Sequence, residues 1–176
     1  MKKHVLIIFT LMVALLTGCA TTPVKDISFD SQADPKVDFK GYKTYTWLGS
    51  AAIVNDSTGQ WEPRSFDADS EVKFLIDREL RGRGMSENDA DPDLVVAFGL
   101  GVDMDALALK TDPKTKLETL DNIPRGALVI ALLDNDTGFV NWVGVAKADV
   151  QQNLTDETAK ARLDYAVTKL LKRIPK

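Results

Sequence analysis

The spacing of apolar and polar positions divides the first half of the chain into a strand and a helix. Residues 37–48, VDFKGYKTYTWL, place aromatic side chains at alternate positions among β-favouring threonines, which predicts a half-buried strand interrupted near Gly41. Apolar residues then recur with helical spacing between Val72 and Leu80, which predicts a helix. Two aspartates suited to cap its start and two glycines suited to its end flank this helix: Asp67, Asp69, Gly82 and Gly84.

A buried strand and an ambiguous segment follow. Residues 93–102, DLVVAFGLGV, form a continuous apolar run that is short and β-branched, which predicts a central strand. The next stretch, residues 103–125, is broken by Pro113 and Pro124. We expect it to be partly a strand extension and partly a mobile loop.

The last third of the chain contains the clearest pattern. Two apolar runs within residues 126–150 flank the turn sequence DNDTG, which predicts a hairpin with Gly138 in a left-handed conformation. An apolar stripe from Ala159 to Ile174 predicts a second helix. Its predicted cap is Thr155 or Asp156, and Pro175 is expected to stop it.

This order of elements predicts an α+β fold. Strand, helix, three strands and helix suggest a two-layer sandwich, in which two helices cover one face of a mostly antiparallel sheet of about four strands. We expect residues 37–176 to form a single domain, since a chain of this length buries enough surface for one core. Residues 19–36 show no sustained periodicity and are expected to be a tether.

The N-terminus has the order of an export signal. Lys2 and Lys3 precede the apolar run from Val5 to Leu16, which is shorter than the roughly 20 residues that cross a bilayer. The sequence Leu16-Thr17-Gly18-Cys19 resembles the lipobox of bacterial lipoproteins. We therefore expect residues 1–18 to be a signal peptide, with an ordinary signal peptide or an uncleaved anchor as the alternatives.

The lipobox resemblance implies a lipid anchor. It implies cleavage between Gly18 and Cys19 and acylation of the Cys19 sulfur, so that acyl chains hold the protein on the membrane surface. In this class an aspartate after the cysteine favours retention at the inner membrane, and Ala20 stands at that position. The expected location is the periplasmic face of the bacterial outer membrane.

Composition excludes several kinds of chemistry. The chain has one histidine, His4, and one cysteine, Cys19, so the mature part has no histidine for a catalytic triad and no set of zinc ligands. An intrachain disulfide is impossible. The net charge is −4, and about −6 once residues 1–18 are removed, which argues against a nucleic-acid partner. We expect no cofactor.

Several stretches together resemble a family of bacterial envelope lipoproteins catalogued as a domain of unknown function, DUF4136. They are VDFKGYKTYTWL at 37–48, LRGRG at 80–84, PDLVV at 92–96, GALVIALLDNDTG at 126–138 and WVGVA at 142–146. The resemblance implies a lipid-anchored α+β domain with no established activity. Residues 106–122 depart from the family pattern, which is richer in glycine and aromatic residues before the last hairpin.

Acidic residues are the first candidates for a site. Asp134, Asp136 and Gly138 resemble the start of a calcium loop, but Gly138 and Val145 stand where an EF-hand needs ligands, so we expect a plain turn. Two further groups of alternating carboxylates flank the strand at 93–102: Asp89, Asp91 and Asp93, then Asp103 and Asp105. We expect them to be solvated, and predict neither a metal site nor catalytic residues.

Tryptophan supplies the remaining candidate. Trp47 and Trp142 lie within predicted strands and are expected to be core residues, whereas Trp61 lies in a polar loop and is the candidate binding residue. We predict a non-catalytic accessory or scaffold protein of the envelope that acts through a protein partner. The alternatives are a binding module for a small apolar or lipid-like ligand, held between sheet and helices or under the Trp61 loop, and a carboxylate-based hydrolase.

Overall fold

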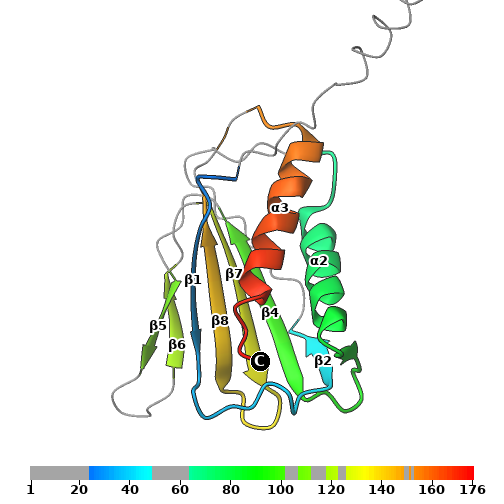
Figure 1. Ribbon diagram of the computed structural model, residues 1–176, viewed down its shortest axis with the longest axis vertical. Helices are drawn as coiled ribbons and strands as arrows, with labels where there is room; N and C mark the ends of the chain where they lie inside the picture. The colour runs from blue at the N-terminus through cyan, green and yellow to red at the C-terminus, as the bar shows by residue number, and fades with distance from the viewer. Residues whose placement is uncertain are drawn as a thin grey trace, which may run out of the picture.

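The computed structural model describes residues 24–48, 64–101, 107–111, 118–122, 126–148, 151 and 153–176. Over these residues the protein has an α+β fold, in which two helices lie side by side on one face of a six-stranded sheet (Figure 1). This confirms the predicted fold class. No helix in the described part of the chain has the length and apolar character needed to span a membrane.

The elements follow one another in the order strand, strand, helix, six strands and helix. They are β1 (Ser28–Ala33), β2 (Thr44–Trp47), α2 (Ala68–Gly82), β3 (Ser86–Glu87), β4 (Leu94–Gly101), β5 (Leu107–Thr111), β6 (Glu118–Asn122), β7 (Ala127–Asp134), β8 (Val140–Lys147) and α3 (Asp156–Leu171).

The sheet is mixed, with the strand order β1-β8-β7-β4-β2-β3. The pairs β1–β8, β8–β7 and β7–β4 are antiparallel, whereas β2 is parallel to both β4 and β3. The parallel pairing follows from α2, which carries the chain back past β2 so that the next strands run in the same direction. The predicted sheet of about four strands was therefore wrong in its strand number and lacked the parallel edge.

The first strand corrects the predicted tether and the predicted start of the domain at residue 37. Residues 28–33, SFDSQA, pair with β8 from Ser28 opposite Lys147 to Ala33 opposite Trp142. Exposed polar side chains alternate with partly buried ones along this edge strand, and only Phe29 and Ala33 pack against the core. Such a polar edge strand has no hydrophobic run by which its sequence would reveal it.

The strand predicted over residues 37–48 is shorter than expected. Only Thr44–Trp47 is a strand, because Asp38 begins a turn in which its backbone and side-chain oxygens accept hydrogen bonds from the Gly41 and Lys40 N–H groups, at 3.1 and 3.0 Å. Phe39 lies in this turn, yet its side chain is only 4% exposed. Its apolar character therefore reports burial rather than strand structure.

Both helices begin at predicted caps. The Asp67 carboxylate accepts a hydrogen bond from the Asp69 N–H at 3.0 Å, and the Thr155 hydroxyl accepts one from the Thr158 N–H at 3.2 Å. After α2 the chain turns at Gly84, whose φ of +85° is a conformation that favours glycine. The central strand β4 and the β7–β8 hairpin, with Gly138 at φ +71°, were also correctly predicted.

Residues 103–125 contain a separate short hairpin. The strands β5 and β6 pair with each other from Leu107 opposite Asn122 to Thr111 opposite Glu118, forming a two-stranded sheet of their own. The segment was expected to extend a strand of the main sheet, but its two strands form a second sheet instead. The expected mobile loop falls outside the described residues.

The core lies between the two helices and the sheet. Its fully buried large side chains come from both layers: Trp142, Tyr45, Ile76, Leu80, Leu94, Ile130, Leu132, Leu170, Leu171, Ile174, Val72 and Val96. A second, smaller buried cluster consists of Ala127, Val129, Ala131, Val143 and Val145 from β7 and β8. Most of the apolar stripe predicted for α3 lies in the main core, so the prediction of a core helix is confirmed.

Trp142 is the largest fully buried side chain, and its position depends on a glycine two residues away. A Cβ atom on Gly144 would lie 2.4 Å from Cη2 and 2.8 Å from Cζ2 of the Trp142 ring, and 3.0 Å from Cδ2 of Leu170. The ring therefore occupies the space that any other residue at position 144 would fill. Trp142 is 1% exposed, and its Nε1 has no hydrogen-bond partner among the described residues, so packing holds the ring.

Candidate functional site

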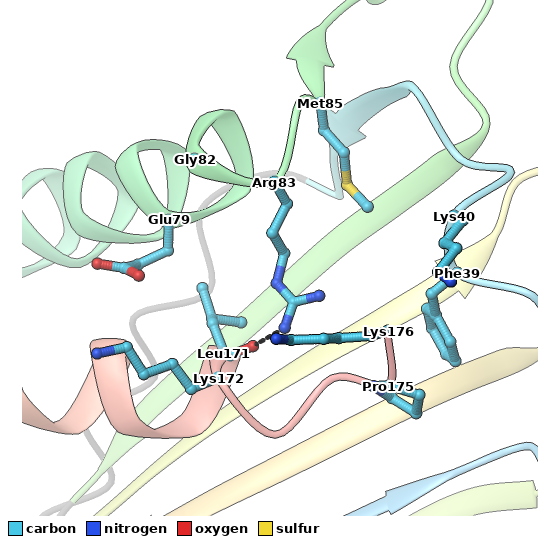
Figure 2. Close-up of a pocket in the computed structure, with 10 residues that line it drawn as sticks. All are labelled: Phe39, Lys40, Glu79, Gly82, Arg83, Met85, Leu171, Lys172, Pro175 and Lys176. Atoms are coloured by element: carbon cyan, nitrogen blue, oxygen red, sulfur yellow. Dashed lines mark hydrogen bonds between the residues drawn. The ribbon is translucent and has the colours of Figure 1, made fainter.

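A hollow in the described part of the chain lies where α2 and α3 both end. It has a volume of about 470 Å³ and is lined by Phe39, Lys40, Glu79, Gly82, Arg83, Met85, Leu171, Lys172, Pro175 and Lys176 (Figure 2). We call it the basic pocket. It brings together the turn before β2, the end of α2 and the end of the chain, three segments that are distant in sequence.

Arg83, the residue that follows α2, is the central side chain of the basic pocket. Figure 2 shows it reaching from the end of α2 towards the chain end, beside Lys176. Its Nη2 donates hydrogen bonds to the carbonyl oxygens of Leu171, at 2.6 Å, and Ile174, at 3.0 Å. The last carbonyls of a helix have no partner within it, so Arg83 satisfies the end of α3 from the neighbouring helix.

The remaining donors of Arg83 are unused. Among the described residues, neither its Nε nor its Nη1 has a hydrogen-bond partner. Burial lowers the pKa of the Arg83 guanidinium, while the nearby Glu79 carboxylate acts in the opposite direction. The group stays charged at neutral pH, because the ordinary pKa of an arginine side chain lies far above neutrality. The pocket thus holds a partly desolvated cation with free donors.

The side-chain charges around Arg83 are mostly positive. Lys40, Lys172 and Lys176 line the pocket, and none of them forms an ion pair within the described part of the chain. Glu79 is the one carboxylate side chain among the lining residues, and it accepts hydrogen bonds from Arg78 and from the Thr168 hydroxyl, each at 2.8 Å. A basic pocket has therefore formed in a chain whose net charge is −4.

The other wall of the pocket is apolar. Phe39, Met85 and Leu171 are 4%, 5% and 1% exposed, and Pro175 completes the lining. These side chains continue the core between helices and sheet, since the first three also belong to its main cluster. The arrangement offers apolar contact and positive charge within one hollow.

The site residues predicted from the sequence are not brought together with this pocket. Gly18 and Cys19, the predicted cleavage and lipidation residues, and Trp61, the candidate binding residue, lie outside the described residues. Trp142 is in the core as predicted. Trp47 is partly buried and packs edge-on against Tyr45 and Phe98. The Nζ of Lys73 lies over its ring, 4.9 Å from the ring centroid.

Two of the three alternating carboxylates before β4, those of Asp89 and Asp93, accept hydrogen bonds from residues 43–46 in and just before β2. The Asp93 carboxylate accepts hydrogen bonds from the Lys43 and Thr44 N–H groups at 2.6 and 2.8 Å, which lower its pKa, and Asp89 accepts one from the Thr46 hydroxyl at 2.5 Å. Asp103 and Asp105 lie outside the described residues. Within the described ranges no three side chains of metal-ligand type gather at one point.

The predicted turn chemistry at Asp134 is confirmed. Its carboxylate accepts hydrogen bonds from the N–H and the hydroxyl of Thr137, at 2.9 and 2.7 Å, and from the Tyr42 hydroxyl at 3.2 Å. These bonds lower the pKa of Asp134, with burial acting in the opposite direction. Asn141 is buried and donates to the Tyr42 oxygen at 2.6 Å, so this cluster joins the turn to the start of β2.

Sequence reasoning did not find the basic pocket. The basic residues near the end of α3 were visible, but positive charge at a helix C-terminus also complements the helix dipole and needs no further explanation. Phe39 and Lys40 come from a turn more than 40 residues before Arg83. Only the fold places that turn at the end of the helices.

Comparisons with known proteins agree on the fold. The family model described as a domain of unknown function, DUF4136, matches residues 29–176. A crystal structure of a DUF4136 family protein from Bacteroides thetaiotaomicron is 10% identical, with a TM-score of 0.56, and the match covers 82% of this chain and 95% of that one.

Another similar structure is a PelC dodecamer from Paraburkholderia phytofirmans, at 13% identity. The match covers 84% of this chain and 99% of that one, with a TM-score of 0.46. No curated protein matches the chain.

Proposed function

The chain belongs to the DUF4136 family, whose function is unknown, and we propose from its own residues that it is a lipid-anchored protein of the bacterial envelope. In this proposal it resides on the periplasmic face of the outer membrane and acts as a non-catalytic accessory or scaffold through contacts with another envelope protein. The observation that carries the proposal is the position of Cys19, the only cysteine, directly after the apolar leader in Leu16-Thr17-Gly18-Cys19.

The arrangement of the domain is compatible with an anchor that precedes residue 24. The segment leading into β1 lies at the upper end of the sheet in Figure 1, while the chain ends lower down, beside the strands (Figure 1). Asp26 in that segment forms a paired ion bridge with Arg162 of α3, at 2.9 and 2.6 Å. The first described residues are therefore bound to the domain, so that a force on an anchor before them would act directly on the domain.

The chemistry of the described residues supports a non-catalytic role. Two of the acidic residues considered as site candidates, Asp93 and Asp134, accept hydrogen bonds from the protein's own backbone and hydroxyl groups. Those bonds hold both pKa values below the usual carboxyl value, which suits a structural role better than that of a proton donor near neutral pH.

The anchor is tested by fractionating cells that express the full chain or its variants. Cys19→Ser should abolish acylation and signal cleavage and should change the distribution between soluble and envelope fractions. Ala20→Asp is the matched control: it should remain acylated but shift from the outer to the inner membrane on a density gradient. A Cys19→Ser chain that is processed identically and sediments equally with envelopes would refute the anchor.

The scaffold role is tested separately by affinity capture from gently solubilised membranes. We expect a second envelope protein to be recovered at a constant ratio to the chain. Recovery of the chain alone, across mild detergents that preserve known envelope complexes, would contradict this role while leaving the anchor intact.

A second candidate function is a binding module for a small apolar or lipid-like ligand. The observation that favours it is the basic pocket, whose volume of about 470 Å³ is within the range of small-molecule sites and whose wall includes Phe39, Met85 and Leu171. The pocket lies at the end of the helices, whereas the space between helices and sheet is filled by core side chains. Native mass spectrometry of the protein from envelope extract should reveal a bound small molecule, and a bare mass would count against this function.

A further inference from the structure

We infer that the basic pocket binds a small organic anion, in which a carboxylate or phosphate group meets Arg83 and an apolar body meets Pro175 and the aliphatic stems of the lining lysines. This inference rests on the second candidate function and specifies the chemistry of its ligand.

The hydrogen-bond donors of Arg83 that have no partner among the described residues indicate which charged group the ligand carries. The guanidinium is held in one orientation by its two bonds from Nη2 to the Leu171 and Ile174 carbonyls, and its Nε and Nη1 remain without partners among the described residues. A guanidinium presents its donors in a plane, in a spacing that matches the two oxygens of a carboxylate or phosphate. A donor group that is oriented in advance and partly withdrawn from water is suited to an oxyanion.

The lysines add charge of the same sign. Lys40, Lys172 and Lys176 place three further ammonium groups around the hollow, and within the described residues they have no carboxylate partner. Glu79, the one carboxylate side chain of the lining, already accepts hydrogen bonds from Arg78 of α2 and Thr168 of α3. Four cationic side chains thus line the hollow beside one carboxylate side chain that already has partners, and a bound anion would reduce the repulsion among the cations.

The apolar lining and the volume of the pocket indicate that the uncharged part of the ligand is apolar. A bare inorganic anion would contact Arg83 and the lysines but leave the exposed apolar lining, Pro175 and the aliphatic stems of the lysines, in contact with water. Covering apolar surface contributes roughly 25 cal/mol per Å². An anion that carries an aromatic or short aliphatic group should therefore bind more tightly than phosphate alone.

The alternative explanation is that the cations only neutralise the ends of the helices. Both α2 and α3 end at this pocket, and their last carbonyls carry a partial negative charge that lysine and arginine complement. That explanation requires no ligand. It predicts that the basic residues affect stability but that no anion binds.

The experiment titrates the full, membrane-extracted chain in phosphatidylcholine nanodiscs by isothermal calorimetry. The probes are phenyl phosphate, inorganic phosphate, the neutral benzyl alcohol and the cation benzylamine. We expect phenyl phosphate to bind most tightly, phosphate more weakly, and the cation not at all. Nanodiscs containing phosphatidylglycerol show whether a lipid headgroup competes for the site or whether it takes a free anion.

Variants connect binding to the pocket. Lys40→Gln and Lys176→Gln should each weaken phenyl phosphate binding roughly twofold to fivefold, as expected for screened surface charges, whereas Lys147→Gln at the far end of β8 should leave binding unchanged. Arg83→Lys, which keeps the charge but loses the planar donors, should weaken binding about tenfold or more. The lysine variants keep the test valid if Arg83→Lys disturbs the end of α3.

The outcomes separate the inference from the function on which it rests. Binding of benzyl alcohol as tight as that of phenyl phosphate would overturn the anion inference while supporting a module for apolar ligands. Binding of phenyl phosphate that is equal in the parent chain and in Lys40→Gln and Lys176→Gln would also overturn it. If none of the four probes binds, the inference and the binding module fail together.

Discussion

Substitution of Gly144 tests the packing of the core most directly. The Cβ of Gly144→Ala would lie 2.4 Å from Cη2 of Trp142, whereas carbon atoms in ordinary contact are about 3.5–4.0 Å apart. The overlap of more than 1 Å falls on a ring that is 1% exposed, so the ring or the strand must move. Overpacking of this kind costs roughly 1–3 kcal/mol.

The expected magnitude includes a smaller opposing effect. Alanine is favoured over glycine within a strand by roughly 0.5–1 kcal/mol, so the net loss for Gly144→Ala should be about 1 kcal/mol, near the lower end of the overpacking range. For a domain of this size, each kcal/mol lowers the melting temperature by about 2–4 °C. The assay is urea and thermal denaturation of the chain without its leader, followed by circular dichroism.

Two further variants show whether the Trp142 ring is the cause. Gly82→Ala, where a Cβ would meet nothing within 4 Å, should be neutral or stabilising by up to about 1 kcal/mol. Trp142→Phe removes the two ring atoms that clash, so adding Gly144→Ala in that background should cost at least about 1 kcal/mol less than it does in the parent. An equal penalty in both backgrounds, or no penalty in the parent, would refute the reasoning.

Three other predictions follow from named contacts. Backbone N–H groups hold the pKa of Asp93 below the ordinary 3.8, so its contribution to stability is present above that pH and is lost as the pH falls through the lower folded-state pKa. Asp93→Asn should therefore flatten the decrease of the urea midpoint that is measured below about pH 4. An unchanged slope would contradict this. Asp26→Asn removes the paired ion bridge to the buried Arg162 and should cost about 1–3 kcal/mol, with faster hydrogen exchange in β1. Its control, the exposed Asp30→Asn, should lie within about 0.5 kcal/mol of the parent, and equal effects of the two variants would argue against a role for the ion pair. Thr155→Ala removes the cap of α3 and should cost about 1 kcal/mol in the same denaturation assay, whereas Thr155→Asp should cost almost nothing, and a neutral alanine variant would show that the cap is not needed.

The parts of the fold that the sequence predicts correctly are those with strong local signals. Both helices have an apolar stripe and a capping residue, and the β7–β8 hairpin has two apolar runs around a turn that needs Gly138, so local physics and tertiary structure agree there. The edge strand β1 lacks such a signal, because its pairing with β8 is made through backbone groups and exposes polar side chains. The parallel pairing of β2 with β4 depends on the path of the whole chain and has no local signal.

The candidate site was less predictable for a related reason. The lipidation proposed for Cys19 can be predicted from the sequence, because it depends on the immediate sequence neighbours of the cysteine. The basic pocket depends on neighbours in space, since Phe39, Arg83 and Leu171 come from three separate segments. Each of them has a sufficient local explanation, as a buried turn residue, a helix end and a core position. Their combination becomes visible only when the chain is folded.

The bridge between Asp26 and Arg162 has a mechanical consequence. A force applied through the residues before Val24 acts first on this ion bridge. Only afterwards does it act on the hydrogen bonds between β1 and β8. Two parallel bonds between planar groups must then break together before the edge strand begins to peel. If the protein is anchored through its N-terminus as proposed, the ion bridge would thus resist mechanical unfolding of β1 at the point of attachment.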